Sequence, residues 1–353
     1  MNALAAISEN KAIDAWTRHF TRSPFQINAP HTADAELLDL PDAGPCRLAA
    51  TIDAISEEIA RGIYKDPFTM GWVTIMASAS DLAAVGSRPL GFLISVSLEP
   101  FRDERFRDRL AEGMAAACRT LGVYILGGDT NVSETLTLTG CGLGLAPLEK
   151  PLSRIGCRPG DAVFLSGGAG RGNALGLRVL AGMPEAIFPE TAFRPIARIK
   201  EASLIAEFAS CAMDTSDGLL ITLDQLSRLN GPGFSIAADW ERILAEDVSA
   251  FCRKTGFPPW FMAAGIHGEF ELVFTIPDRS LESFRAAAAS RGSHFISLGV
   301  VRETEGLGLV LDGGAKTEID MAPLRNLWSR PEVRLSQAIE KYHAWGRRWR
   351  LEP

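Results

Sequence analysis

Two aspartates stand three residues apart in the segment AMDTSDGLL, at residues 212–220, with an apolar run behind them. A single carboxylate at the start of a helix is usually an N-cap, because it accepts hydrogen bonds from free backbone N–H groups. Asp214 and Asp217 supply one carboxylate more than a cap requires. The pair therefore indicates a place where two negative charges meet a cation.

Four further aspartates lie at the edges of apolar segments, where we expect a loop to meet a regular element. They are Asp34 in TADAELL, Asp53 in TIDA, Asp81 in SASDLAAVG and Asp129 in LGGDTN. Six like charges brought together repel one another unless hard cations lie among them, and sites built from oxygen ligands suit Mg²⁺. The set predicts a nucleoside triphosphate held through Mg²⁺. For each aspartate alone, a helix cap is the alternative.

A glycine-rich segment, SGGAGRGNALG at 166–176, is a second candidate for phosphate binding. It follows an expected strand and enters a helical pattern, and a helix N-terminus of this kind can hold phosphate. The third glycine of a GxGxxG motif comes one position too late, at Gly176, and no GxxxxGK[ST] loop occurs in the chain. A dehydrogenase and a plain strand-to-helix turn are both compatible with the segment.

The composition excludes several other classes of protein. The chain has 353 residues, a formal net charge of -7 and no basic stripe of the kind that nucleic-acid-binding surfaces carry. No uninterrupted apolar stretch reaches the roughly 18 residues that a membrane span needs. The six cysteines and five histidines are scattered without metal-ligand spacing. We therefore expect reduced thiols, no zinc site and a cytoplasmic protein.

Alternating apolar residues predict the elements that position the carboxylates. Residues 91–99 and 135–145 have the period of two that is typical of half-buried strands. Between them, the apolar side chains of 105–121 fall on one helical face, and Gly122 is placed to end that helix. Residues before about 45 read as loop. In the second half we expect helices at 218–229 and 334–345, and strands at 161–166, 234–239, 270–276, 296–301 and 306–314.

The length and one composition break predict two domains. A chain of 353 residues exceeds the size at which a single core usually stops growing. Pro147 and Pro151 flank an acid–base pair just before a new strand, as expected at a domain boundary. We therefore expect a mixed α/β fold with domains at 1–148 and 149–353. The tryptophans of the tail, at 328, 345 and 349, are expected either to pack there or to close over a flat acceptor.

Several segments, taken together and in this order, resemble one enzyme superfamily. They are TADAELLDLP, TIDA, SASDLAAVGSRP, LGGDT, SRIGCRPGDAVFLSG, AMDTSDGLL and GEFELVFT, and the likeness runs from about 30 to 312. The superfamily includes aminoimidazole ribonucleotide synthetase, selenophosphate synthetase, a hydrogenase-maturation protein and thiamine-monophosphate kinase, which the chain resembles most. The resemblance implies an ATP-dependent enzyme, commonly a homodimer. It also implies an N-terminal sheet domain that forms the dimer and the ATP site, with a C-terminal α/β domain packed against it.

The resemblance also implies roles for particular residues. The family's Mg²⁺ ligands fall on Asp34, Asp53, Asp81, Asp129, Asp214 and Asp217, of which Asp129 and Asp217 would act in catalysis. Its nucleotide contacts fall on Gly127, Gly128, Thr130, Arg154 and Ser216.

The chain departs from the kinase pattern on the acceptor side. The first acidic motif reads TAD instead of GDD, Ile52 replaces a threonine, and Val132 stands where an arginine is common. The histidine that normally follows the TD motif is replaced in the region of Ala60 and Arg61. The GGEDYEL motif becomes IHGEFEL, which makes His267 and Glu269 candidate acceptor contacts. Because the loss of polar contacts changes discrimination strongly, thiamine phosphate is not the expected acceptor.

The function expected from these observations is transfer of the γ-phosphoryl group of ATP to a small acceptor. Such catalysis rests on positioning and charge neutralisation, so it requires no side-chain nucleophile. Two alternatives remain: a ligase or cyclase of the aminoimidazole ribonucleotide synthetase type, and an ATP-binding scaffold that has lost catalysis, which the altered first motif suggests.

Overall fold

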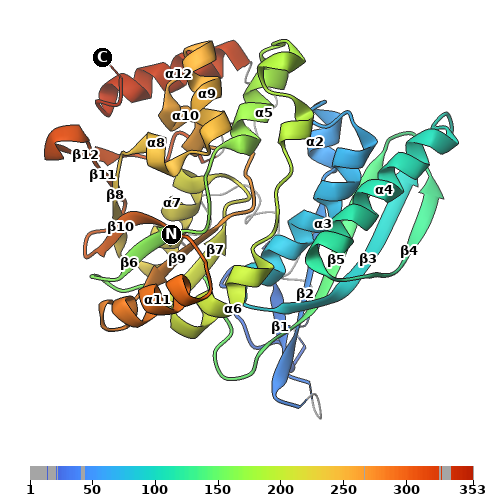
Figure 1. Ribbon diagram of the computed structural model, residues 1–353, viewed down its shortest axis with the longest axis horizontal. Coiled ribbons are helices and arrows are strands. Elements are labelled where there is room, and N and C mark those ends of the chain that lie inside the picture. Colours follow the sequence, from blue (N-terminus) through green and yellow to red (C-terminus); the bar gives the residue numbers. More distant parts are fainter. Residues whose placement is uncertain are drawn as a thin grey trace.

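The computed structural model describes residues 14, 21, 23–40, 44–265, 267–325, 327 and 335–352. Its strands form two sheets, each with helices against it (Figure 1). The first sheet has the order β1-β2-β5-β3-β4 and comprises β1 (Glu36–Leu38), β2 (Cys46–Ala54), β3 (Arg88–Leu98), β4 (Ile125–Val132) and β5 (Thr137–Pro147). All neighbouring strands within this sheet are antiparallel except β3 and β4, which are parallel.

The helix α3 (Pro67–Ala84) covers one face of this sheet and is buried on almost all sides. Asp66 caps its start by accepting hydrogen bonds from the N–H groups of Phe68 and Thr69. Three alternating glycines of β5 allow close approach, since a Cβ on Gly140 would lie 2.6 Å from the carbonyl oxygen of Thr74. The sequence signal for this helix is weak because a helix that is apolar all round has no amphipathic period.

The helix α4 (Glu104–Leu121) lies beside α3 (Figure 1) and packs on it through two reciprocal glycines. A Cβ on Gly71 would overlap the carbonyl oxygen of Leu110, and one on Gly113 would overlap that of Phe68. These overlaps involve backbone atoms, which cannot rotate away. The two helices therefore cross at a distance that only glycine permits at these positions.

We predict that Gly113→Ala lowers the free energy of unfolding by about 1–3 kcal/mol, because one methyl group must push two helices apart. Urea denaturation followed by circular dichroism measures this loss. Ala111→Ser, which adds one atom on the exposed face of the same helix, is the matched control. Equal stability of the two variants would contradict the close crossing.

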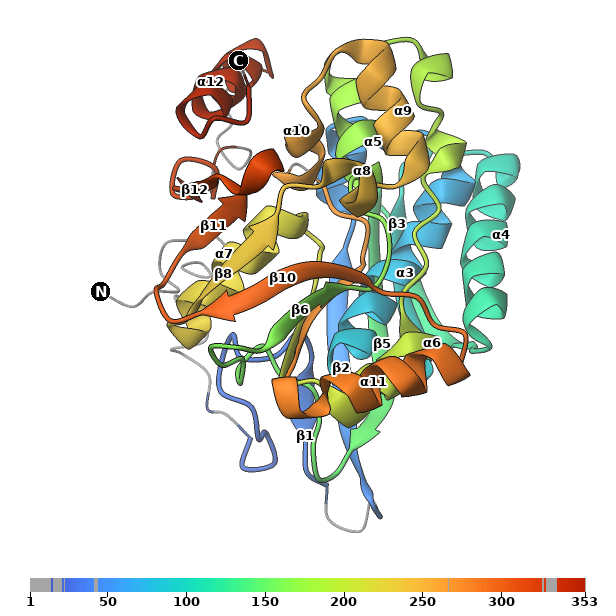
Figure 2. The ribbon, with the colours of Figure 1, turned by 60° about the vertical axis from the view of Figure 1, so that its left-hand side comes forward.

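The second sheet has the order β12-β11-β8-β10-β6-β9-β7. Its strands are β6 (Ala162–Leu165), β7 (Cys211–Asp214), β8 (Gly233–Ala237), β9 (Leu272–Ile276), β10 (Ile296–Arg302), β11 (Leu307–Val310) and β12 (Lys316–Ile319). Helices α6 (Ile199–Phe208) and α11 (Asp278–Ser290) cover one face (Figure 2). Phe284 of α11 contacts Phe164 and Phe274 of the sheet. The remaining helices are α2 (Ser56–Ala60), α5 (Arg171–Leu180), α7 (Leu219–Asn230), α8 (Trp240–Ile243), α9 (Glu246–Thr255), α10 (Pro259–Ala263) and α12 (Leu335–Arg348).

The helix α3 also joins the two sheets. The indole N–H of Trp72 donates to the carbonyl of Pro195 at 2.7 Å, and the Ser80 hydroxyl donates to Asp214 at 2.7 Å. One side of α3 thus touches the first sheet while another reaches the end of β7. Residues far apart in the chain are brought together along this helix.

Most elements expected from the period of apolar residues are confirmed. The helix at 105–121 ends at Gly122, whose φ of 70° is left-handed. The expectation for 306–314 was partly wrong, because β11 stops at Val310 and residues 312–314 form a 3-10 turn. In the tail, Trp349 is buried against Trp260 and Trp345, so these rings pack together, and Trp328 lies outside the described residues. In the part of the chain described, no helix is long and apolar enough to cross a membrane.

Candidate active site

Three carboxylates from distant parts of the chain converge between the two sheets. Asp34 precedes β1, Asp81 lies in the last turn of α3 and Asp214 ends β7. One oxygen atom of each lies within 4.8 Å of those of the other two. We call these three residues the carboxylate cluster.

Burial and mutual repulsion disfavour full ionisation of the cluster. The pKa of Asp81 is raised well above its ordinary value, first by burial and then by the charges of Asp53, Asp214 and Asp34. The pKa of Asp214 is raised to about 7, again by burial first and by the charge of Asp34 second. Protons or cations must therefore offset the charge here at neutral pH.

Polar neighbours hold the three carboxylates in place. The Thr51 hydroxyl donates to Asp81 at 2.5 Å, and Arg154 forms an ion pair with Asp34 at 2.7 Å between Nη2 and Oδ1. Asp34 Oδ2 is buried and makes no hydrogen bond among the described residues, and the same holds for Arg154 Nε. The cluster therefore retains polar groups that a ligand could satisfy.

The other three predicted metal residues lie outside this cluster. Asp53, on β2, acts electrostatically on Asp81 and Asp214. Asp129 lies on the exposed strand β4 and accepts a hydrogen bond from the Asn131 amide at 2.7 Å. Asp217 is exposed in the turn before α7, where its charge raises the pKa of Glu58.

The helix-cap alternative is wrong for the aspartates that the structure places inside elements. Asp53 and Asp129 lie within strands, and Asp81 is at the end of its helix instead of its start. The N-cap of α7 is Gly218, to which no side chain adds a capping hydrogen bond. Capping is therefore not the reason for these carboxylates.

The predicted nucleotide contacts lie in three separate segments, and one of them, Arg154, is the loop residue paired with Asp34. Gly127, Gly128 and Thr130 belong to the exposed strand β4. Gly128 lies so close to β3 that a Cβ would overlap the carbonyl oxygen of Ile94. Ser216 lies in the exposed turn after β7, and its carbonyl accepts a hydrogen bond from the N–H of Gly268 at 2.8 Å.

The phosphate-binding interpretation of 166–176 is wrong, because a carboxylate already occupies the start of α5. Glu269 Oε2 accepts a hydrogen bond from the N–H of Gly170 at 2.7 Å, and Oε1 accepts one from the Thr215 hydroxyl at 3.1 Å. A Cβ on Gly172 would overlap the carbonyl oxygen of Gly268. These glycines therefore serve close packing against residues 267–269.

The buried carboxyl group of Glu269 should make the free energy of unfolding depend on pH. Burial raises its pKa from 4.5 to about 8, so its stabilising contribution is present below pH 4.5 and is lost as the pH rises through 8. Glu269→Gln cannot ionise. We expect its stability relative to the unchanged protein to rise by about 2 kcal/mol or more between pH 5 and pH 8. Urea denaturation of metal-free protein at both pH values tests this, and parallel pH curves would contradict it.

His267 is buried, with 6% of its surface exposed, instead of solvated as a loop histidine usually is. Its Nε2 is hydrogen-bonded to the Tyr64 hydroxyl, and its ring packs against Phe193. Burial lowers the pKa of His267 to about 4, so the ring is neutral at pH 7. Sequence reasoning missed Tyr64, because no local pattern links residue 64 to residue 267.

Relatives of this chain are ATP-using enzymes, which makes it a kinase or a synthetase. Residues 32–146 match the family described as AIR synthase related protein, N-terminal domain. The thiamine-monophosphate kinase of Archaeoglobus fulgidus is 32% identical over 262 residues, 73% of this chain and 81% of that protein. The chain belongs to the thiamine-monophosphate kinase family.

Solved structures agree with this assignment. A protein called tt0281 from Thermus thermophilus superimposes with a TM-score of 0.73 at 30% identity, covering 86% of this chain and 96% of that one. AaThiL complexed with AMPPCP and TMP has a TM-score of 0.69 at 26% identity, covering 84% and 92%. The hydrogenase maturation protein HypE in complex with ATP shares the fold at 19% identity, with a TM-score of 0.64, covering 92% and 100%.

Proposed function

We propose that the protein transfers the γ-phosphoryl group of ATP to a small acceptor that is not thiamine phosphate. The observation that carries this proposal is the carboxylate cluster of Asp34, Asp81 and Asp214 in a member of this kinase family. Asp53 adds to the negative charge at the cluster. We further propose that residues 1–148 form the ATP-binding domain and 149–353 the domain that completes the acceptor site.

The residues of the cluster fit Mg²⁺. They offer oxygen atoms only, Asp34 Oδ2 is buried without a hydrogen-bond partner, and two of the three carboxylates have raised pKa values that a cation would lower. Asp129 and Asp217 would complete the metal and phosphate contacts when ATP binds. Bound Mg²⁺ would neutralise charge on the transferring phosphoryl group. Thr51, Ser80 and Arg154 would keep the carboxylates oriented.

Two features support an acceptor other than thiamine phosphate. Ala60 ends α2 where the family has its histidine region, and Arg61 forms an ion pair with Glu57 of the same helix at 2.6 Å. Ile52 and Val132 have apolar side chains, so neither side chain supplies a polar contact. On the acceptor side we place His267 and Glu269 instead, both buried beside Tyr64 or Thr215.

The first experiment is thermal denaturation across an ATP titration with and without Mg²⁺, with NAD⁺ as the control. A ligand that binds only the folded state raises stability by about 2.7 kcal/mol at a hundredfold excess over its dissociation constant. We expect a shift that needs both ATP and Mg²⁺. No shift, or a shift independent of the metal, would refute the proposal.

A screen of acceptors then separates the three possible outcomes of ATP use. A kinase forms ADP and a phosphorylated product, whereas a ligase or cyclase forms ADP and releases inorganic phosphate. The fold shared with HypE keeps the second outcome open. Tight Mg-ATP binding without ADP formation across the panel would indicate a scaffold protein. Thiamine monophosphate belongs in the panel, and we expect it to be turned over poorly.

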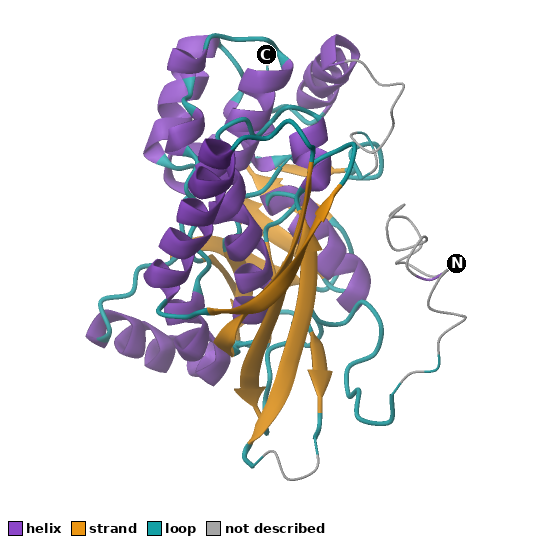
Figure 3. Ribbon diagram, turned by 90° about the vertical axis from the view of Figure 1, so that its right-hand side faces the viewer, coloured by secondary structure: helices purple, strands orange, loops and turns teal. Residues whose placement is uncertain are grey.

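The outer face of the first sheet supports a homodimer. The helices α3 and α4 lie on one face only, and the opposite face is uncovered in Figure 3. Apolar side chains stand exposed there and along the edge strand β4, including Ile52, Leu93, Tyr124, Ile125 and Leu126. Exposed apolar edges of this kind mark interfaces. We propose that two copies pair through this sheet, and light scattering of Leu126→Lys should then give monomers.

A further inference from the structure

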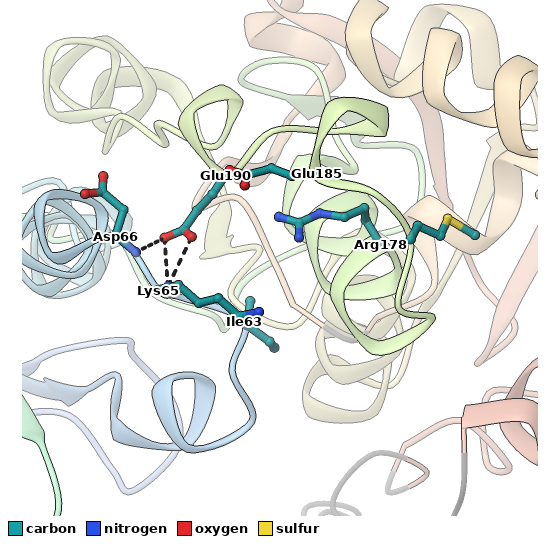
Figure 4. A pocket seen from close by; sticks show the side chains of 7 residues that line it. Ile63, Lys65, Asp66, Arg178, Glu185 and Glu190 are labelled. Atoms are coloured by element: carbon teal, nitrogen blue, oxygen red, sulfur yellow. Dashed lines mark hydrogen bonds between the residues drawn. The ribbon is translucent and has the colours of Figure 1, made fainter.

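A cavity of about 420 Å³ lies beside the proposed acceptor site (Figure 4). The residues after α2, helix α5 and the 3-10 turns η2 (Glu185–Ile187) and η3 (Glu190–Ala192) surround it. Its charged lining residues are Lys65, Asp66, Arg178, Glu185 and Glu190. None of the six predicted metal ligands is among the lining residues described, so the cavity is separate from the carboxylate cluster.

Two of the three lining carboxylates are already engaged by the protein. Asp66 caps α3 and lies 3.4 Å from the guanidinium of Arg194. Glu190 accepts hydrogen bonds from the backbone N–H groups of Lys65 at 3.1 Å and Asp66 at 3.0 Å. Among the described residues, neither lining cation, Lys65 nor Arg178, forms an ion pair with a carboxylate, whereas Asp66 is paired with Arg194. The two unpaired cations are therefore the groups that an anion would contact.

Arg178 is the strongest sign of a missing ligand. Only 6% of its surface is exposed, and Nε donates to the carbonyl of Phe188 at 3.1 Å. Among the described residues, its two Nη groups make no hydrogen bond, and no carboxylate lies within ion-pair distance. Figure 4 shows the guanidinium directed into the cavity. The guanidinium thus lines the cavity without a carboxylate partner, and its fork of N–H groups matches an oxyanion.

The cavity adjoins the site at which the acceptor would react. Ile63 and Lys65 line it, and Tyr64 between them reaches across to His267. Tyr64 is itself fully buried, and Glu190, which accepts hydrogen bonds from the N–H groups of the next two residues, also lines the cavity. One molecule could therefore extend from the reaction site into the cavity.

We propose that this cavity binds an oxyanion group, a phosphate or a carboxylate, at the end of the acceptor remote from the transferred phosphoryl group. Arg178 holds the group through its Nη atoms, and Lys65 adds a second positive charge at the rim. This inference rests on the proposed function for the identity of the ligand, but not for the anion site itself. Thiamine monophosphate carries an aminopyrimidine at its remote end, which offers Arg178 no anion.

The test of the anion site uses inorganic phosphate and acetate as probes, with EDTA present, without ATP, and at constant ionic strength. We expect at least one probe to raise the melting temperature saturably. In Arg178→Met the apparent affinity should fall by about tenfold or more, because a charge-assisted hydrogen-bond pair is lost. Arg107→Met, at an exposed position on α4, should bind like the unchanged protein. No shift with either probe, or equal shifts in all three proteins, overturns the site.

Arg178→Met should fold, because Met is unbranched and apolar and can follow the buried stem of Arg178, with the loss of one hydrogen bond to Phe188. Lys65→Met, whose side chain is exposed, is the second variant and should weaken binding several-fold. Unchanged binding in Lys65→Met together with an unfolded Arg178→Met would also overturn the site. In the ADP assay, a probe that binds should compete with the acceptor. Binding without competition would overturn the link between the anion site and the acceptor. If the protein binds the anion but does not use ATP, the anion site stands and the proposed function fails.

Discussion

Asp214→Asn is expected to lower Mg²⁺-dependent ADP formation by on the order of a thousandfold while leaving the protein folded. The side chain lies at the end of β7 with an oxygen within 4.8 Å of those of Asp34 and Asp81. An amide removes one negative charge from this cluster but preserves the shape of the side chain, and its oxygen can still accept the hydrogen bond from Ser80. Initial rates with saturating ATP and a series of Mg²⁺ concentrations measure the loss.

The same variant should be more stable than the unchanged protein when no metal is present. Burial and the charge of Asp34 raise the pKa of Asp214 from 3.8 to about 7, so its stabilising contribution is lost as the pH rises through 7. At pH 8 we expect Asp214→Asn to gain on the order of 1–3 kcal/mol. Asp108→Asn, on the exposed face of α4, should change neither rate nor stability. Full Mg²⁺-dependent turnover in Asp214→Asn would falsify the metal assignment.

Arg154→Met is expected to destabilise the protein by about 3–5 kcal/mol, because it breaks a buried ion pair and leaves one partner charged. Arg154 lies 2.7 Å from Asp34, whose side chain is completely buried, and its charge also lowers the pKa of Asp214. Its removal increases the repulsion within the carboxylate cluster. Urea denaturation at pH 7.5 in EDTA measures the loss.

Two further variants show whether the effect of Arg154 is electrostatic. The double change Arg154→Met with Asp34→Asn should recover much of the stability, since the uncompensated charge is gone. Mg²⁺ should partly rescue the single variant for the same reason. Arg158→Met, in the same loop but exposed, is the control. If Arg154→Met stays within about 1 kcal/mol of the unchanged protein, the ion pair does not hold the cluster together.

Prediction from sequence succeeded where a residue's role depends on its near neighbours. The helix ending at Gly122 and the strand at 270–276 were found because an apolar period and a left-handed glycine are local signals. The sequence places Asp129 where a loop meets a regular element, whereas the structure has it inside the strand β4. Its two glycines and the aspartate are typical of turns, and the exposed side chains of this strand give no apolar period. The prediction of a phosphate-binding turn at 166–176 was wrong for a different reason. The carboxylate that occupies this turn belongs to Glu269, about 100 positions further along the chain.

The sequence by itself determined which six aspartates are candidate metal ligands, which family the chain resembles and where most helices and strands lie. Composition and neighbouring residues carry that information. Only the tertiary structure decided that Asp34, Asp81 and Asp214 form one cluster while Asp129 and Asp217 lie apart. It alone paired Tyr64 with His267 and left Arg178 buried without a carboxylate. The physical reason is that desolvation and charge interaction depend on distances between residues, which chain order does not specify.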